Sequence, residues 1–220
     1  MFWFVRERGC AVGRLCRIMA AGEALAADCA RMQAPLAPSR RAAAFLALQS
    51  RQERLHASVF RAGAVMLSGV RSGDDADRLF DPVRRCLAED LAAGRFAESL
   101  VGLQVVVEAL GAVVLGELDA VLSARGAPFA SLRREIRSQE LSHHAFGVRW
   151  LERLLMAELV APRAIARAGE GYVAAMDGVI DRCRDLAFHL DRQPASLTQA
   201  FRAALPPWLS RPERVLGSHN

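Results

Sequence analysis

The sequence contains no lysine and few aromatic residues. All 29 basic residues are therefore arginine, and aromatic residues make up 6% of the chain. With 24 acidic residues the formal net charge is +5, a modest excess that permits an acidic partner without requiring one. We do not expect nucleic acid as a partner from this charge alone.

Cysteine is also scarce, and its spacing is not that of a metal or disulfide framework. The five cysteines are odd in number and form no C-x-x-C pair. A disulfide scaffold, a cysteine zinc site and an attached iron-sulfur module are therefore not indicated. We expect a reducing, cytoplasmic location.

Neither a secretory leader nor a membrane span is predicted. The apolar run at the start ends at Arg6 and Glu7, too early for the apolar core of a secretory signal. The longest apolar stretch, 102–122, is interrupted by Gln104, Glu108 and two further acids, which makes it too polar to face lipid. We expect this stretch to be a helix buried in protein.

Strand alternation is nearly absent, whereas apolar residues recur at helical spacing along most of the chain. The sequence therefore predicts an all-α protein. Ser39 is a candidate N-cap, Pro82 a candidate first helical residue, and Gly94 an interruption. The long helices are expected over about 13–32, 40–67, 95–122, 131–159 and 163–190. A short helix is expected from Asp81, a connection over 68–82 and an extended tail from Pro206.

The chain is long enough to bury a substantial core, since 52% of its 220 residues are hydrophobic. We find no repeat of solenoid type and no linker that would separate two domains. A single domain over 1–220 is therefore predicted, with a core bundle over about 13–159 and a C-terminal helical extension over about 163–209.

Two of the long helices carry the same pairing of an acid and an imidazole. In QSRQERLHASVF, residues 49–60, Glu53 and His56 stand three positions apart, and in IRSQELSHHAFG, residues 136–147, Glu140 and His143 repeat the spacing. Residues at i and i+3 share one helix face, so each pair can present a carboxylate oxygen and a ring nitrogen to one point. His144 is a second candidate for the imidazole, although its position breaks the symmetry between the two pairs.

The helix before each pair carries one acid in an apolar surrounding. Glu23 lies among alanines and Glu108 among valines and leucines. Four converging helices would gather four carboxylates and two imidazoles, and buried carboxylates without cations would repel and lose their hydration. Two divalent cations would neutralise them. Glu23 could instead be a boundary residue that reaches solvent, which would degrade the first metal position.

This constellation resembles the ferritin-like di-iron and di-manganese carboxylate proteins, which take one Glu from each of two helices and Glu-x-x-His from each of the other two. The resemblance covers about 13–159 and implies a four-helix bundle with a long crossover between its second and third helices. It also implies the metal ligands: Glu23 and His56 on one metal, Glu108 and His143 on the other, and Glu53 and Glu140 bridging.

Within this superfamily, the spacing and the motif QELSHHAFGVRWL are most similar to the small oxygenases such as the cyanobacterial aldehyde-deformylating oxygenases, and less so to the tRNA-hydroxylating di-iron enzymes. The resemblance implies two iron ions, with manganese or a mixed pair as alternatives, and an external electron donor such as a ferredoxin or a reductase. Apolar neighbours, among them Phe45, Phe60 and Phe146, favour an enzyme that uses O2 to oxidise a partly apolar small molecule.

Other functions stay open at the level of sequence. A ferritin-like protein could bind or oxidise iron without an organic substrate, a di-iron hydroxylase could modify tRNA, and a bundle that has lost its site could be purely structural. The lone tyrosine, Tyr172, lies outside the four ligand helices, so a stored tyrosyl radical has no obvious host. A homodimer is compatible with the sequence.

Overall fold

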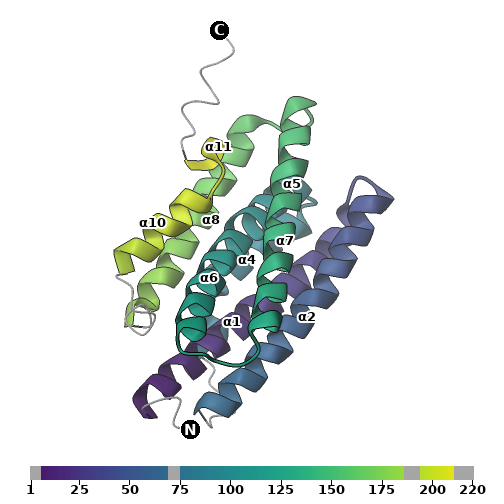
Figure 1. Ribbon diagram of the computed structural model, residues 1–220. Coiled ribbons are helices and arrows are strands. Elements are labelled where there is room, and N and C mark those ends of the chain that lie inside the picture. Colours follow the sequence, from purple (N-terminus) through teal and green to yellow (C-terminus); the bar gives the residue numbers. More distant parts are fainter. Residues whose placement is uncertain (1–5, 69–74, 186–193, 211–220) are drawn as a thin grey trace.

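The computed structural model describes residues 6–68, 75–185 and 194–210, and every regular element in these ranges is helical. The prediction of an all-α protein is confirmed. Most of these residues belong to long helices that pack side by side around one apolar core (Figure 1).

Four long helical segments form the bundle. The first two, joined by the short helix η1 (Ala34–Leu36), lie against each other along much of their length (Figure 1). The third segment is continuous through α5, η2 and α6, and it packs against the fourth. The segments are α1 (Arg6–Gln33), α2 (Arg40–Ser68), α5 (Phe96–Leu100) with η2 (Val101–Val107) and α6 (Glu108–Ala124), and α7 (Ala130–Met156).

A long crossover connects α2 to the third segment, as the sequence predicts. It contains α3 (Asp75–Leu79) and α4 (Asp81–Ala92), while 69–74 lie outside the described residues. The predicted connection over 68–82 contains one short helix at 75–79, where two aspartates in the first turn favour a helix. Gly94 has φ 69° and separates α4 from α5, which confirms the predicted interruption.

The expected helix boundaries have identifiable causes. The hydroxyl of Ser39 accepts a hydrogen bond from the backbone N–H of Ala42 at 3.1 Å, so Ser39 caps α2 as predicted. Gly126, with φ 63°, follows the end of α6. The first helix begins earlier than expected, at Arg6, and the fourth ends earlier, at Met156, just before Glu158 with φ 54°.

The C-terminal extension packs against the third segment on the side away from α2 (Figure 1). It consists of α8 (Pro162–Arg182), α10 (Pro194–Ala204) and α11 (Pro207–Ser210), while 186–193 lie outside the described residues. The predicted extended tail is wrong at α11. Pro207 fits the first position of a helix, where its missing N–H is not needed, and Leu209 is buried against Gly169.

The stretch Phe96–Ala124 is long and apolar enough to cross a membrane, with a mean hydropathy of 1.9 over its most apolar window. Within the protein, however, 78% of that window is buried. Helices α7, α8 and α10 pack against it, so its composition is that of the central helix of the bundle.

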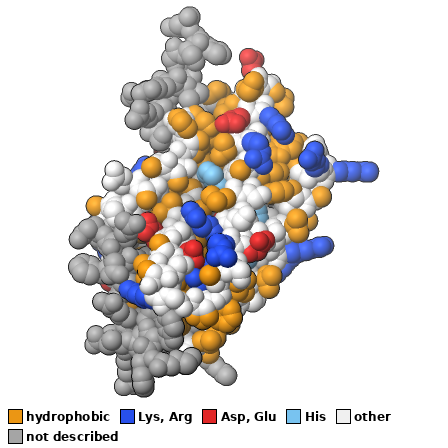
Figure 2. Space-filling view, viewed as in Figure 1, with side chains coloured by type: hydrophobic (Ala, Val, Ile, Leu, Met, Phe, Trp, Pro, Cys, Tyr) orange, Lys and Arg blue, Asp and Glu red, His pale blue; other side chains and the backbone are white. Residues whose placement is uncertain are grey.

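The surface in Figure 2 is mixed in character. Arginine side chains are spread among apolar and uncharged groups on this face and do not form one continuous basic area.

Candidate metal centre

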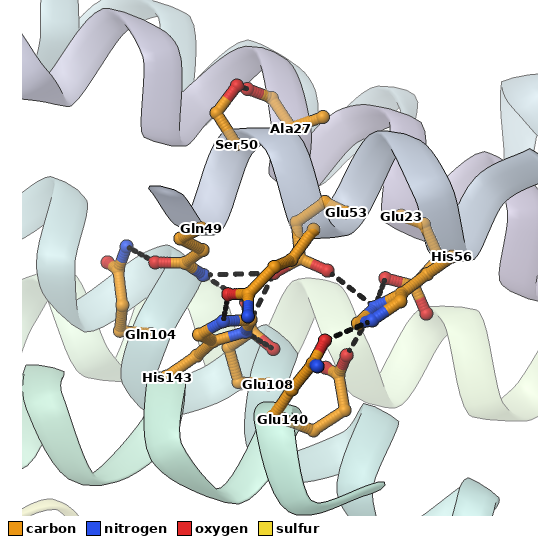
Figure 3. Close-up of polar contacts among 12 residues, drawn as sticks. Glu23, Ala27, Gln49, Ser50, Glu53, His56, Gln104, Glu108, Glu140 and His143 are labelled. Atoms are coloured by element: carbon orange, nitrogen blue, oxygen red, sulfur yellow. Dashed lines mark hydrogen bonds and ion pairs between the residues drawn. The ribbon is translucent and has the colours of Figure 1, made fainter. Parts of the chain in front are cut away.

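The six candidate ligands meet in the middle of the bundle. Their donor atoms form two groups, and within each group the atoms lie within 4.8 Å of one another. Figure 3 shows these side chains pointing toward one another from different helices. One group is Glu23, Glu53, His56 and Glu140, and the other is Glu53, Glu108, Glu140 and His143.

The first group surrounds the ring of His56. Its Nδ1 lies 3.0 Å from Glu53 Oε2, 3.0 Å from Glu140 Oε1 and 3.7 Å from Glu23 Oε2. Glu23 is 8% exposed and directs its carboxylate toward this ring, so it is not a boundary residue reaching solvent. The first position thus offers three carboxylates and one imidazole.

The second group surrounds the ring of His143. Its Nδ1 lies 2.8 Å from Glu53 Oε1 and 3.8 Å from Glu108 Oε2. Glu53 therefore faces both histidines, one with each carboxylate oxygen. Glu53 and Glu140 also belong to both groups, which is the arrangement expected of residues that bridge two metals.

Each histidine is oriented by a glutamine from the opposite helix. Gln139 Oε1, on α7, lies 2.8 Å from Nε2 of His56, and Gln52 Oε1, on α2, lies 3.0 Å from Nε2 of His143. An amide oxygen can only accept, so each Nε2 carries the proton and donates it. In the neutral ring this leaves Nδ1, the atom that faces the carboxylates, with a free lone pair for a metal.

A buried row of amides adjoins the carboxylates on the side of Glu108. The amide nitrogen of Gln49 donates to Glu108 Oε1 at 2.7 Å and to Glu53 Oε1 at 3.2 Å. Gln104 donates to Gln49 Oε1 at 3.1 Å and exchanges two hydrogen bonds with Gln33, at 2.7 and 3.1 Å. The three glutamines are fully buried, so these bonds satisfy groups that cannot reach water.

A π-helical segment positions two of these groups. All seven residues of η2 are buried, and the segment ends directly before Glu108. Gln104 lies in its middle, where α7 approaches closely: a Cβ added to Gly147 would lie 2.4 Å from the Cβ of Gln104. Such wider turns are rare and recur at functional sites.

His144 is directed away from the candidate ligands. Its Nδ1 lies 3.0 Å from the backbone oxygen of Gln104, to which it donates. Burial lowers the pKa of His144, so the ring is neutral at physiological pH. The geometry favours His143 over His144 as the imidazole of the second position.

Burial and mutual repulsion control the charges of the metal-free cluster. Burial raises the pKa values of Glu23 and Glu108, and repulsion from Glu140 raises them further. Burial also acts to raise the pKa of Glu53, but the close contacts with His143 and His56 outweigh it and the pKa is about 2. Burial acts to lower the pKa of His56, but the contacts with the carboxylates of Glu140, Glu23 and Glu53 raise it to about 12.

Two buried atoms of the cluster, Oε1 of Glu140 and Nδ1 of His143, make no well-oriented hydrogen bond, although each lies within 3.0 Å of an oppositely charged or ionisable group. Buried polar atoms are nearly always paired by hydrogen bonds, so these two atoms indicate a missing partner. Carboxylate and imidazole donors suit iron and manganese, and two divalent ions would balance four carboxylates. The residues present therefore fit a pair of divalent metal ions.

An apolar cavity begins at the carboxylates and extends between α1, α6, α8 and α10. It measures about 810 Å³, counted with the open space at its mouth. Glu23, Glu108 and Glu140 are the acids that line it. The remaining lining is mostly apolar and includes Leu15, Met19, Phe80, Val114, Met176 and Leu197.

Sequence reasoning did not assign roles to Gln49, Gln52 or Gln139. The signal was present, because Gln precedes Glu in both motifs, in RQERLH and SQELSH. Gln49 also stands one turn before Glu53 on the same helix face. A glutamine that recurs beside a buried acid is a candidate partner for the opposite histidine.

Comparison with known proteins supports the fold. The structure is similar to that of "Protein 19 with aldehyde deformylating oxidase activity from Synechococcus", with a TM-score of 0.77 and 22% identity, covering 99% of this chain and 100% of that one. The chain has a ferritin-like helical fold. No protein-family model and no curated protein matches the sequence. At this identity the likeness concerns the fold alone.

Proposed function

We propose that the protein is a non-haem oxidoreductase with two metal ions, iron or an iron and manganese pair, that uses O2 to oxidise a partly apolar small molecule. The observation that carries the proposal is the buried cluster of four carboxylates and two imidazoles at the end of an apolar cavity. The similar solved structure is of a protein with aldehyde-deformylating oxidase activity, which agrees with this class of reaction.

The side chains would hold the metals in the two groups described above. Glu23 and His56 would bind one ion, Glu108 and His143 the other, and Glu53 and Glu140 would bind both. When bound, such a metal pair supplies electrons for the activation of O2. Gln52 and Gln139 would keep each imidazole in the tautomer that binds metal, and Gln49 would hold Glu108 and Glu53 in place.

The cavity would select and place the substrate. Its apolar walls exclude water from the reacting end and bind an aliphatic or aromatic body. Three carboxylates at one end direct the polar head of a substrate toward the metals. Helices α8 and α10 contribute Met176 and Leu197 to the wall, so the C-terminal extension would be part of the substrate site.

Electrons would come from a separate protein, a ferredoxin or a reductase, and we expect the enzyme to work in the cytoplasm. The described cysteines Cys16, Cys29, Cys86 and Cys183 are free thiols. Burial raises the pKa of Cys16 to about 11 and that of Cys183 to about 11, so these two are unreactive thiols at physiological pH.

The test begins with anaerobic titration of the metal-free protein with Fe(II), followed by O2 in the presence of a chemical reductant and a panel of aliphatic aldehydes, alcohols and acids. Two metal ions per chain and product formation from an apolar substrate are expected. A stoichiometry of one, or a closed tetrahedral zinc site, would contradict the proposal. Continued iron uptake beyond two ions without organic product would indicate a ferritin-like iron oxidase.

A cavity variant separates substrate binding from metal binding. Ala26 is buried and lines the cavity, so Ala26→Phe should obstruct it and weaken binding of an apolar substrate while two metals still bind. Ala47 lies exposed on α2, and Ala47→Phe is the matched control. Equal substrate binding by both variants would place the substrate elsewhere.

A further inference from the structure

A row of aromatic rings connects the candidate metal centre with the outside of α7. His143, Phe146 and Trp150 lie on one face of this helix, at positions i, i+3 and i+7. Phe45, on α2, lies between the first two. Its ring centroid is 6.1 Å from that of His143 in an edge contact, and 4.0 Å from that of Phe146, to which it is stacked at an interplanar angle of 8°.

The row ends at Trp150. The centroids of Phe146 and Trp150 are 6.1 Å apart, and the guanidinium carbon of Arg153 lies 5.8 Å from the Trp150 ring centroid. Trp150 is partly buried and Arg153 is exposed, so the row reaches from a buried imidazole to solvent. Phe45, Phe146 and Trp150 do not line the apolar cavity, so the substrate site proposed above does not use these three rings.

Close aromatic contacts favour single-electron transfer, because the electron crosses only short distances between π-systems. In this row one contact is stacked, one is an edge contact and one is tilted. Phenylalanine is very hard to oxidise, so Phe45 and Phe146 would pass an electron without holding the charge. Indole is among the side chains that lose an electron most readily. Of Phe45, Phe146 and Trp150, Trp150 is therefore the residue that would be oxidised.

We propose that Trp150 is a one-electron donor to the metal centre through Phe146 and Phe45, and that it is oxidised when O2 reacts there without an organic substrate. The proposal rests on the function proposed above, because the metal pair oxidised by O2 is the oxidant. One electron leaves the indole and reduces that pair by one equivalent. The Arg153 cation disfavours a positive ring, so the Nε1 proton leaves to solvent. The neutral indolyl radical then adds O2, and the peroxyl group takes one electron from a further Fe(II) ion and one proton from water, which leaves a hydroperoxide on the indole.

The molecule contains its own comparison residue. Trp208, on α11, is also partly buried and packed against the core, but it takes no part in the row. An oxidant that leaves the site and diffuses would attack both tryptophans, whereas transfer along the row would select Trp150. Trp3 lies outside the described residues.

The experiment uses the full chain, loaded anaerobically with Fe(II) and exposed to O2 without organic substrate. Proteolysis and mass spectrometry then measure the gain of oxygen by each tryptophan peptide, and iron content and O2 consumption are recorded on the same samples. Oxygenation of Trp150 several-fold above that of Trp208 is expected. In Phe146→Leu, which breaks the stack, oxygenation of Trp150 should fall several-fold at equal O2 consumption.

Two further variants keep the test decisive. Phe45→Leu interrupts the same row from α2 and replaces Phe146→Leu if that variant does not fold. Phe60→Leu changes a buried phenylalanine of α2 that is no part of the row and should leave Trp150 oxygenation as in wild type.

The possible results separate the two proposals. Equal oxygenation of Trp150 and Trp208, or no decrease in Phe146→Leu and Phe45→Leu, would overturn the role of Trp150. Consumption of O2 with Trp150 intact would overturn it too and leave the proposed function standing. A chain that binds no iron or consumes no O2 would remove the proposed function, and the role of Trp150 with it.

Discussion

Gln139 on α7 holds the ring of His56 on α2, with 2.8 Å between Oε1 and Nε2. The mirror contact, between Gln52 on α2 and His143 on α7, measures 3.0 Å. Each half of the bundle thus orients the imidazole of the other half. A helix pair by itself would lack this partner, so the two Glu-x-x-His motifs form a site only as a set.

Replacing either glutamine should weaken metal binding without removing a ligand. Gln139→Leu and Gln52→Leu are each expected to lower metal affinity by about 10–100-fold, because the freed ring loses its preferred tautomer and orientation. Competitive Fe(II) or Mn(II) titration measures this change. Gln199→Leu, at an exposed position of α10, is the matched control. Unchanged affinity in both site variants would show that the crosswise bonds do not position the histidines for metal.

The two adjacent histidines should respond differently to substitution. His143→Ala removes a ring nitrogen that faces Glu53 and should reduce the metal content to about one ion per chain. His144→Ala removes a hydrogen bond to the backbone of Gln104 and should leave the metal content at two. Elemental analysis of both reconstituted variants decides the matter. The reverse pattern would make His144 the ligand.

Glu108 should affect metal binding and stability in opposite directions. In the metal-free protein Glu108 is a buried acid whose pKa burial raises, and the amide of Gln49 donates a hydrogen bond to it. Glu108→Gln should lower metal affinity steeply, yet leave the free energy of unfolding of the metal-free protein unchanged or raise it by about 1–4 kcal/mol. Chemical denaturation and metal analysis test the two effects together.

A leucine at this position serves as a comparison. Glu108→Leu leaves an N–H of Gln49 without this acceptor, which costs about 1–3 kcal/mol, so this variant should be less stable than Glu108→Gln. Both metal-free variants strongly destabilised, with metal content intact, would make Glu108 a structural residue.

The metal-free protein should lose stability as the pH rises above 6.5. The pKa of His56 is about 12 in the folded state against an ordinary value of 6.5, so between these values the folded state binds one more proton than the unfolded state. Stability from this group is complete below pH 6.5 and decreases above it, by up to about 1.4 kcal/mol per pH unit. The raised pKa values of Glu23 and Glu108 act in the same direction.

Urea denaturation of the metal-free protein at several pH values measures this slope. Glu53 acts in the opposite direction, but its pKa of about 2 confines its effect to pH values below its ordinary 4.5. His56→Gln should flatten the slope, and His144→Gln should preserve it. A flat profile in the wild type would mean that His56 is neutral in the metal-free fold.

Helical geometry predicted the two pairs of Glu and His, and the resemblance to the ferritin-like carboxylate proteins implied how the six residues would group. Glu53 and His56 share one helix face because they stand three positions apart. The apolar surroundings of Glu108 indicate that the helix carrying this acid is buried. The structure brings all six candidates together in the expected groups, with Glu23 turned inward. Whether they bind metal is a prediction for the titrations above.

Other features depend on tertiary contacts that periodicity does not reveal. Gln104, in the middle of the π-helical segment η2, is bound by Gln33 and Gln49, which lie on two other helices. The helical turn α11 depends on Leu209 packing against Gly169 of α8. Both partners are distant in sequence, so neither feature has a local signature strong enough to predict it.

The row of buried amides has a consequence for how the centre is assembled. An amide has a donor end and an acceptor end, and the carboxylates of Glu108 and Glu53 accept only the donor end of Gln49. The amides of Gln104 and Gln33 must then each have one orientation, because a flipped amide would place two donors or two acceptors opposite each other. This series of hydrogen bonds is complete only when helices α1, α2 and η2 are aligned in one register. The protein therefore aligns these helices by its own polar groups, and the proposed metal ions would bind to a frame that is already set.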